Sequence, residues 1–253
     1  SDGKVFLYTT EHSANAPHLK GVQFRWVNAT TGAEIWTIDG YGTNNGFAIA
    51  DGYFVYLNLY DLQIYTVGKG PSQTTVTASP KVSTEGSSVI IEGSVTDIAT
   101  GTKQNEQAAR FPNGIPAVSD ASMSAWMDYV YMQKPRPTDT TGVPVTLSVI
   151  DSNNNERVIG NTTSNDDGFF TFNWTPDIAG QYTVFASFEG SKSYWPSYAV
   201  TSFAVDAAAP TATPLPVAAQ PPTEMYFIIS TIAIIAAIAI IGFVIILVLR
   251  KRP

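Results

Sequence analysis

The residue types that most often perform catalysis or bind metals are sparse in this sequence. Its 253 residues include no cysteine and only two histidines, His12 and His18, with Glu11 beside the first. The lack of cysteine excludes a catalytic thiolate, a disulfide and a thiolate metal site, and the histidines lack the further ligands that a metal site needs. Neither a Gly-x-Ser-x-Gly elbow nor a His-Glu-x-x-His motif occurs. We therefore expect no enzyme, no cofactor and no metal.

Two segments rich in Asn and Asp offer oxygen ligands of the kind that calcium prefers. Residues 151–156 space such side chains like the first half of a calcium loop, but position six is Glu156 instead of Gly and position twelve is Thr162 instead of Glu. Residues 165–168 end in Gly168, which suits a turn with positive φ. We interpret both segments as turns.

The composition shows that the chain folds, whichever elements position these residues. The chain is 44% hydrophobic with a mean hydropathy of +0.04, which excludes a disordered acidic chain because such chains lack the apolar surface to offset ordering entropy. With 14 basic and 21 acidic residues, the net charge is −7, and this acidity makes nucleic acid an unsuitable partner.

Residues 225–249 form an uncharged apolar run, which predicts one transmembrane helix in contact with membrane lipid. Residues 250–253 begin with three basic residues, so we place this tail in the cytoplasm and the N-terminal domains outside the cell membrane, in a single-pass topology. The exterior then keeps 11 basic and 21 acidic residues, a net charge of −10. Because residues 1–4 show no export signal, we expect residues upstream of Ser1 to be missing from this sequence.

Small residues along the predicted membrane helix suit close approach of a second helix. They are Ala233, Ala237 and Gly242. We include them as candidate partner-docking residues, with the alternative that alanine is simply common in such helices.

Before the helix, residues 207–224 contain five prolines and predict a semi-rigid Pro/Thr-rich spacer.

Residues 73–206 alternate apolar and polar side chains in short runs separated by turns, which predicts a β-sandwich with one buried face per strand. The segment from Gly180 through Tyr182 to Gly190, followed by Tyr194, resembles bacterial and archaeal Ig-like surface repeats. The resemblance implies that Trp174 and Tyr182 are core or corner residues.

A helical insertion at about residues 115–134 interrupts this rhythm. Apolar residues recur there at helical spacing, with Ser119 or Asp120 able to cap the amino end. The apolar stripe consists of Met123, Trp126, Met127, Val130 and Tyr131. Either the stripe packs on the neighbouring sheet, or it docks on another protein as a Met- and aromatic-rich surface.

Residues 1–72 carry the most recognisable motif. Trp26, a Thr31-Gly32 turn and Trp36 resemble the blade repeat of quinoprotein-like (PQQ-type) β-propellers, with Asn28 in the place of the usual Asp. The resemblance implies one or two terminal blades of an incomplete ring, because a propeller needs about four to eight blades. The missing blades would come from residues absent here or from a second chain, and no cofactor-binding residue carries over.

The sequence as a whole thus predicts a mainly β protein: partial propeller blades, an Ig-like β-sandwich with a helical insertion, and one C-terminal transmembrane α-helix. This order resembles archaeal membrane-anchored PQQ-like propeller repeat surface proteins.

Three Asn-x-Thr sequons are candidate glycosylation sites. They begin at Asn28, Asn161 and Asn173. Asn161 is the best candidate because we expect a turn after it, and Asn173 is the weakest because its strand is expected to be buried.

These features favour a membrane-anchored extracellular protein with a structural or protein-interaction role, such as that of a subunit of a cell-envelope or membrane complex. The alternative is an accessory or substrate-binding subunit of a membrane enzyme. Contacts along the membrane helix and the Trp126 helix favour the second hypothesis, and contacts confined to the β domains favour the first. A third hypothesis is sugar binding by Tyr194, Trp195 and Tyr198.

Overall fold

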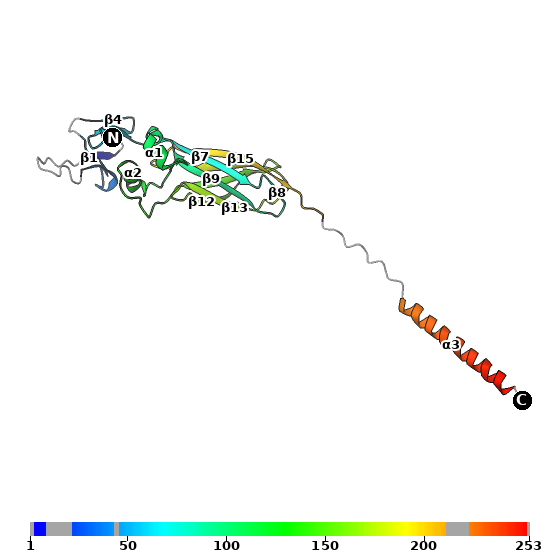
Figure 1. Cartoon of the computed structure of the whole chain (residues 1–253). Coiled ribbons are helices and arrows are strands. Elements are labelled where there is room, and N and C mark those ends of the chain that lie inside the picture. Colours follow the sequence, from blue (N-terminus) through cyan, green and yellow to red (C-terminus); the bar gives the residue numbers. More distant parts are fainter. Residues whose placement is uncertain (1–2, 9–21, 43–45, 211–222, 252–253) are drawn as a thin grey trace. The chain divides into compact units, whose positions relative to one another are not determined.

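The computed structural model describes residues 3–8, 22–42, 46–210 and 223–251. The chain divides into two compact units, Ser1–Ala208 and Ala209–Pro253. Figure 1 shows the chain from the N-terminal strands to the C-terminal helix. His12 and His18, and most of the predicted spacer, lie outside the described residues.

The middle of the first unit is an Ig-like sandwich (Figure 1). One sheet contains β7 (Ser72–Ser79), β9 (Val89–Asp97), β10 (Ile115–Pro116) and β13 (Phe169–Trp174). The other has the order β12 (Glu156–Thr163), β11 (Pro144–Ile150), β14 (Gly180–Phe188), β15 (Ser197–Asp206), β8 (Val82–Thr84). Strand β8 runs parallel to β15 and all other pairs are antiparallel. This strand order is that of an Ig-like domain, with β7 in one sheet and the short β8 that follows it in the other.

Alternating strand residues build the core of the sandwich, as the sequence predicts. Val89, Leu147 and Tyr182 are fully buried. The Tyr182 hydroxyl donates to the Ile178 carbonyl at 3.1 Å and accepts from the Ile178 amide at 3.2 Å, and the Trp174 ring lies 5.3 Å from the Tyr182 ring. The expected core and corner roles of Trp174 and Tyr182 are confirmed.

The insertion lies between β9 and β11 and contains η1 (Thr100–Lys103), α1 (Asn105–Arg110), β10 and α2 (Met123–Tyr131). The residue before α2 is Ser122, which makes no side-chain capping bond. The capping role expected of Ser119 or Asp120 is wrong, because both side chains are engaged elsewhere: Ser119 pairs with Thr141, and Asp120 binds the loop that follows β14.

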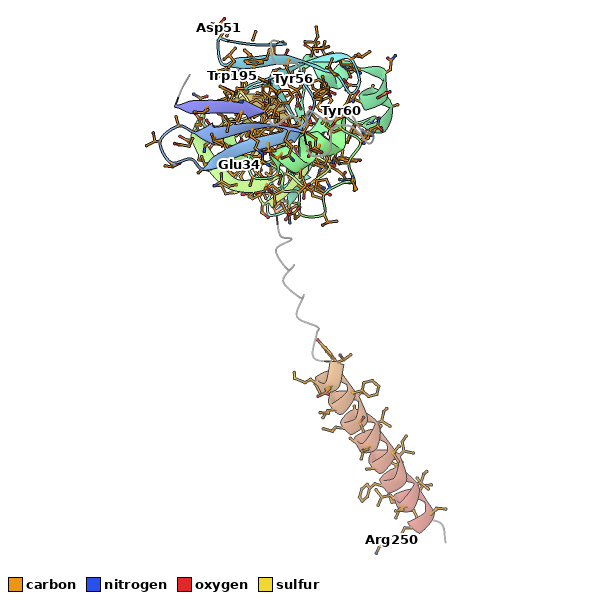
Figure 2. All side chains as sticks on the ribbon, turned by 90° about the vertical axis from the view of Figure 1, so that its left-hand side faces the viewer. Glu34, Asp51, Tyr56, Tyr60, Trp195 and Arg250 are labelled. Carbon is orange, nitrogen blue, oxygen red and sulfur yellow. The ribbon has the colours of Figure 1, made fainter. Side chains whose placement is uncertain are left out.

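The N-terminal module consists of two three-stranded antiparallel sheets. The first contains β1 (Lys4–Tyr8), β2 (Gln23–Asn28) and β3 (Glu34–Asp39), and the second contains β4 (Phe47–Ala50), β5 (Tyr53–Asn58) and β6 (Gln63–Val67). In the β4–β5 hairpin, labelled at Asp51 in Figure 2, both Asp51 and Gly52 have positive φ, as a two-residue hairpin turn requires.

The two sheets of the N-terminal module are repeats of one another. Phe24 and Trp26 of β2 correspond to Phe54 and Tyr56 of β5, thirty residues further on. The cross-strand partners correspond too, since Trp26 faces Trp36 and Tyr56 faces Tyr65. At the strand ends, Asn28 and Asn58 each accept a hydrogen bond from the backbone amide two residues later.

The two repeats pack through the same face. The Phe24 ring lies 4.0 Å from the Tyr56 ring and 5.5 Å from the Phe54 ring, and Trp26 lies 5.2 Å from Phe54. In a propeller, each blade packs one face on the previous blade and the opposite face on the next. Here two equivalent faces are in contact, so the described residues show two meander repeats in a two-layer pair, and propeller blades stay a prediction.

The second unit contains α3 (Thr223–Arg250), a helix of 28 residues that includes an 18-residue window with a mean hydropathy of 3.4. By length and composition it is able to cross a membrane. None of its residues is buried, unlike a core helix of a soluble domain, so its apolar surface requires lipid or another chain.

Candidate protein-interaction surface

Helix α2, the first predicted docking element, is part of the interior. Met123, Trp126 and Val130 are exposed by at most 6% and belong to the Ig-like core, while Met127 and Tyr131 are half-buried against it. The alternative interpretation of the stripe, packing on the neighbouring sheet, is the one that the structure shows. The side chains of Met123, Trp126 and Val130 are therefore not accessible to a partner in this conformation.

The polar face of α2 joins the sandwich to the N-terminal module. The backbone amides of Thr37 and Asp39 on β3 donate to Ser124 Oγ and Asp128 Oδ1, each at 3.1 Å. These two amides lie on the edge of β3 that no strand pairs among the described residues. The helix thus covers a sheet edge that would otherwise be open, and Met127 packs on the cores of both domains.

Charges reinforce this junction. The Lys134 ammonium lies 2.5 Å from a carboxylate oxygen of Asp39. Burial alone would raise the pKa of Asp39, but hydrogen bonds from Lys134 and Gln23 lower it below its ordinary value. Asp128 has a raised pKa because burial outweighs the hydrogen bond from Asp39. The two carboxylates therefore play different parts, with Asp39 ion-paired and Asp128 accepting from backbone.

The loop after β14 fixes the same end of the sandwich. The Asp120 carboxylate accepts hydrogen bonds from the amides of Lys192 and Ser193 and from the hydroxyls of Ser191 and Ser193, at 2.6 to 3.1 Å. Gly70 exchanges backbone hydrogen bonds with residues of this loop. The N-terminal module therefore sits at the end of the sandwich opposite Asp206, where the chain leaves the domain (Figure 1).

The N-terminal module exposes apolar side chains beside two unpaired strand edges. Among the described residues, β1 pairs only with β2, and β4 pairs only with β5. The exposed fractions on these strands are 41% for Val5, 49% for Leu7, 43% for Phe47 and 41% for Ile49. We call these four residues, with the free edges of β1 and β4, the edge surface (Figure 2 shows this end of the first unit). Open apolar edges of this kind are templates for pairing with another strand.

An aromatic cavity of about 20 Å³ lies between the two edges. Its lining includes Phe6 and Tyr8 of β1 and Phe47 of β4, and the Tyr8 and Phe47 rings are 6.1 Å apart. This volume holds about one water molecule, so the cavity is a dent in the aromatic layer and not a site for a small organic ligand.

Sequence reasoning missed the edge surface, although two signals were present. The Phe-x-Trp-x-Asn and Phe-x-Tyr-x-Asn motifs at residues 24–28 and 54–58 reveal the repeat. The short apolar segment Val5–Leu7 before them then implies a third strand, which among the described residues pairs only with β2.

The docking candidates on α3 are solvent-exposed in the second unit. Ala233 and Ala237 are exposed and Gly242 is half-exposed. A Cβ atom added to Gly242 would meet nothing within 4 Å, so this glycine is not required by packing within the chain. Helix pairing through these residues stays a prediction.

The sequons occupy three different environments. Asn161 on β12 and Asn173 on β13 are both exposed, whereas Asn28 is half-buried and its Oδ1 accepts hydrogen bonds from the amides of Thr30 and Thr31. Asn161 lies within a strand and not directly before a turn. The expectation that Asn173 is buried is wrong, because its side chain lies on the outer face of an edge strand.

The Asn- and Asp-rich segments are turns. The Asp151 carboxylate accepts from the amides of Asn153 and Asn155, both at 2.9 Å, and from the Arg157 guanidinium at 3.2 Å. These bonds, led by that from Asn155, lower the pKa of Asp151. With its carboxylate fully used, the segment offers no open ligand set, and the described residues contain no group of three acidic or His side chains placed to hold a metal.

The aromatic residues considered for sugar binding do not form one surface. Tyr194 is 2% exposed and lies in the core, whereas Trp195 and Tyr198 are 51% and 70% exposed. The Lys69 ammonium covers the Trp195 ring at 4.5 Å, so this ring is engaged by a cation of its own chain.

No family model matches the chain, and no curated protein matches it significantly. Solved structures with local similarity include the PKD domain of an M14-like peptidase from a Thermoplasmatales archaeon, 15% identical over 55% of this chain and 99% of that chain, with a TM-score of 0.29. The CARDB domain of a Pyrococcus furiosus protein is 12% identical over 55% and 96%, with a TM-score of 0.29. A tandem-repeat region of a large adhesion protein is 14% identical over 81% and 42%, with a TM-score of 0.34. Since these scores are low, the Ig-like assignment rests on the strand order.

Proposed function

We propose that this chain is a membrane-anchored extracellular protein that presents the edge surface to other proteins, without enzymatic activity. The observation that carries the proposal is the separation of anchor and surface within one chain. The chain leaves the sandwich at Asp206, and the open strands β1 and β4 lie at the other end of the first unit. A covalent anchor at one end leaves the other end free to bind.

The burial of α2 favours this role over that of an accessory subunit docked on a membrane enzyme. The accessory hypothesis relied on the Trp126 helix as a docking stripe, and Trp126 is fully buried. Its remaining support is Ala233, Ala237 and Gly242 on α3, whose spacing alone does not specify a partner. We place the basic end of α3 in the cytoplasm and expect glycans at Asn161 and Asn173.

Purification of the full chain from native membranes in mild detergent tests the proposal. The edge variant carries Leu7→Lys and Ile49→Lys, and its matched control carries Val82→Lys on β8, where Val82 is 58% exposed. We expect copurifying protein with the wild type and the control, and its loss from the edge variant, because lysine on an edge disfavours strand and apolar contact. Recovery of the wild type alone, or partners that the edge variant retains, would refute the proposal.

A further inference from the structure

A polar groove of about 290 Å³ lies on the outer face of the sheet that contains β7 and β9. Its floor consists of four side chains from these two strands, with Gln73 opposite Thr96 and Thr75 opposite Ser94. The walls come from η1 and from the turn before β10, and they include Ile98, Thr102, Lys103, Phe111, Asn113 and Gly114. The volume is close to the lower end of the range for ligand sites, about 300 Å³.

Hydrogen bonds and close packing fix both walls. The amide and the hydroxyl of Thr102 both donate to the Ala99 carbonyl, at 3.0 and 2.7 Å. In the turn, the Gly114 amide donates to the Phe111 carbonyl at 3.0 Å. Gly114 has a φ of +90°, and a Cβ atom added to it would lie 3.1 Å from the side chain of Thr96. The groove is therefore formed before a ligand binds, which reduces the entropy cost of binding.

The groove contains polar groups that are free to bind a ligand. The side-chain amides of Gln73 and Asn113 are exposed and make no hydrogen bond within the described part of the chain, and neither does the Lys103 ammonium. Each amide offers two donors and an acceptor. On the floor, the hydroxyls of Thr75 and Ser94 lie 2.8 Å apart and bond to each other, and each keeps capacity for a further hydrogen bond. The groove thus presents groups that both donate and accept.

We propose that this groove binds a neutral saccharide. Every sugar hydroxyl both donates and accepts hydrogen bonds, as do the free amides and hydroxyls of the groove. The C–H faces of a sugar ring are apolar and need apolar surface beside these polar groups. Ile98, which is 37% exposed, and the half-buried Phe111 supply that surface. The inference goes beyond the proposed function, because the groove shares no residue with the edge surface.

The same lining disfavours other classes of ligand. A peptide that extends a sheet needs open backbone groups, whereas β9 pairs with β7 on one side and β13 on the other. A phosphate or carboxylate is best held by Arg or by several backbone amides, and Lys103 is the only basic residue of the lining. Asp97 also lines the groove, but it is 8% exposed and its carboxylate accepts from the Ala99 amide at 2.8 Å. An apolar ligand would leave the floor hydroxyls without water or a partner.

Binding of the full chain to a printed array of neutral oligosaccharides tests the site. The protein is held in phosphatidylcholine nanodiscs, because a detergent with a sugar headgroup would compete, and calorimetric titration then gives the Kd of the strongest-binding oligosaccharide. The groove variant carries Gln73→Ala and Asn113→Ala. Its matched control carries Gln181→Ala and Asn153→Ala, at exposed positions outside the groove. We expect the groove variant to raise the Kd at least about tenfold through lost hydrogen bonds, and the control to leave it unchanged.

Gln73→Glu is a second variant, which keeps the side-chain shape and removes its two donors, with Gln181→Glu as its control. It replaces the groove variant if that variant loses β-sheet circular dichroism, and it should also raise the Kd. A wild type that binds no oligosaccharide of the array, or a Kd that neither groove substitution changes, would overturn the inference. If the wild type binds no saccharide and the groove variant loses a copurifying protein, the groove binds a peptide segment and the inference is wrong. The edge variant should keep saccharide binding, so failure of the proposed function leaves this result unaffected.

Discussion

Replacing Trp126 with Ala tests whether α2 is a structural link or a docking element. Trp126 is fully buried, with ring contacts to Tyr129 at 5.4 Å and Phe111 at 6.1 Å. Its indole Nε1 has no hydrogen-bond partner, so the substitution removes packing and leaves no polar group newly unpaired. We expect a loss of about 3–5 kcal/mol of unfolding free energy, the range for large buried aromatic side chains.

Urea unfolding of the full chain in detergent, followed by β-sheet circular dichroism, measures this loss. For a unit of this size it corresponds to a fall in Tm of about 6–20 °C. The matched control is Val158→Ala, because Val158 is 62% exposed and its truncation should cost within about 0.5 kcal/mol. Trp126→Phe should cost less than Trp126→Ala, since it keeps most of the ring volume.

An unchanged urea midpoint for Trp126→Ala would refute this account of α2. If the variant also lost its copurifying protein without losing stability, the helix would be a docking surface after all. The predicted instability should extend to the N-terminal module, because Met127, the next residue, packs on both cores.

Three further predictions concern surface groups. Asp120→Ala should destabilise the unit at neutral pH. Burial raises the pKa of Asp120, but the hydrogen bonds from residues 191–193 outweigh it and lower this pKa below its ordinary value. The stabilisation by the Asp120 carboxylate is therefore present above the unfolded pKa of about 3.9, and urea titrations should show its loss as pH falls below that value. Chelation with EDTA should leave Tm unchanged, because Asp151 is saturated by its own turn; a fall in Tm would contradict the turn interpretation. Intact-mass measurement of native protein should show glycan mass that Asn161→Gln and Asn173→Gln each reduce, with Asn28→Gln as the comparison.

The elements that a local sequence pattern specifies could be predicted from the sequence alone. The membrane-type helix follows from an uninterrupted apolar run, and the Ig-like strands follow from period-two alternation, including the buried corner at Tyr182. Both signals depend on neighbouring residues and require no knowledge of distant contacts.

The role of α2 was not predictable, because an amphipathic stripe looks the same whether it packs on its own chain or on another. Only the fold shows that Trp126 meets the core and that Ser124 and Asp128 meet the edge of β3, nearly ninety residues earlier in the sequence. The blade motif likewise indicated antiparallel strands but not which sheet faces meet.

The sequence by itself therefore determined the parts of this protein: a mainly β first unit with an Ig-like domain, and one apolar helix. The tertiary structure decided which surfaces remain open. Equivalent faces of the two sheets pack through Phe24 and Phe54. Helix α2 covers the edge of β3, while β1, β4 and β6 each pair with a single strand among the described residues. Edge exposure depends on pairing between residues far apart in the chain, and local periodicity carries no information about that pairing.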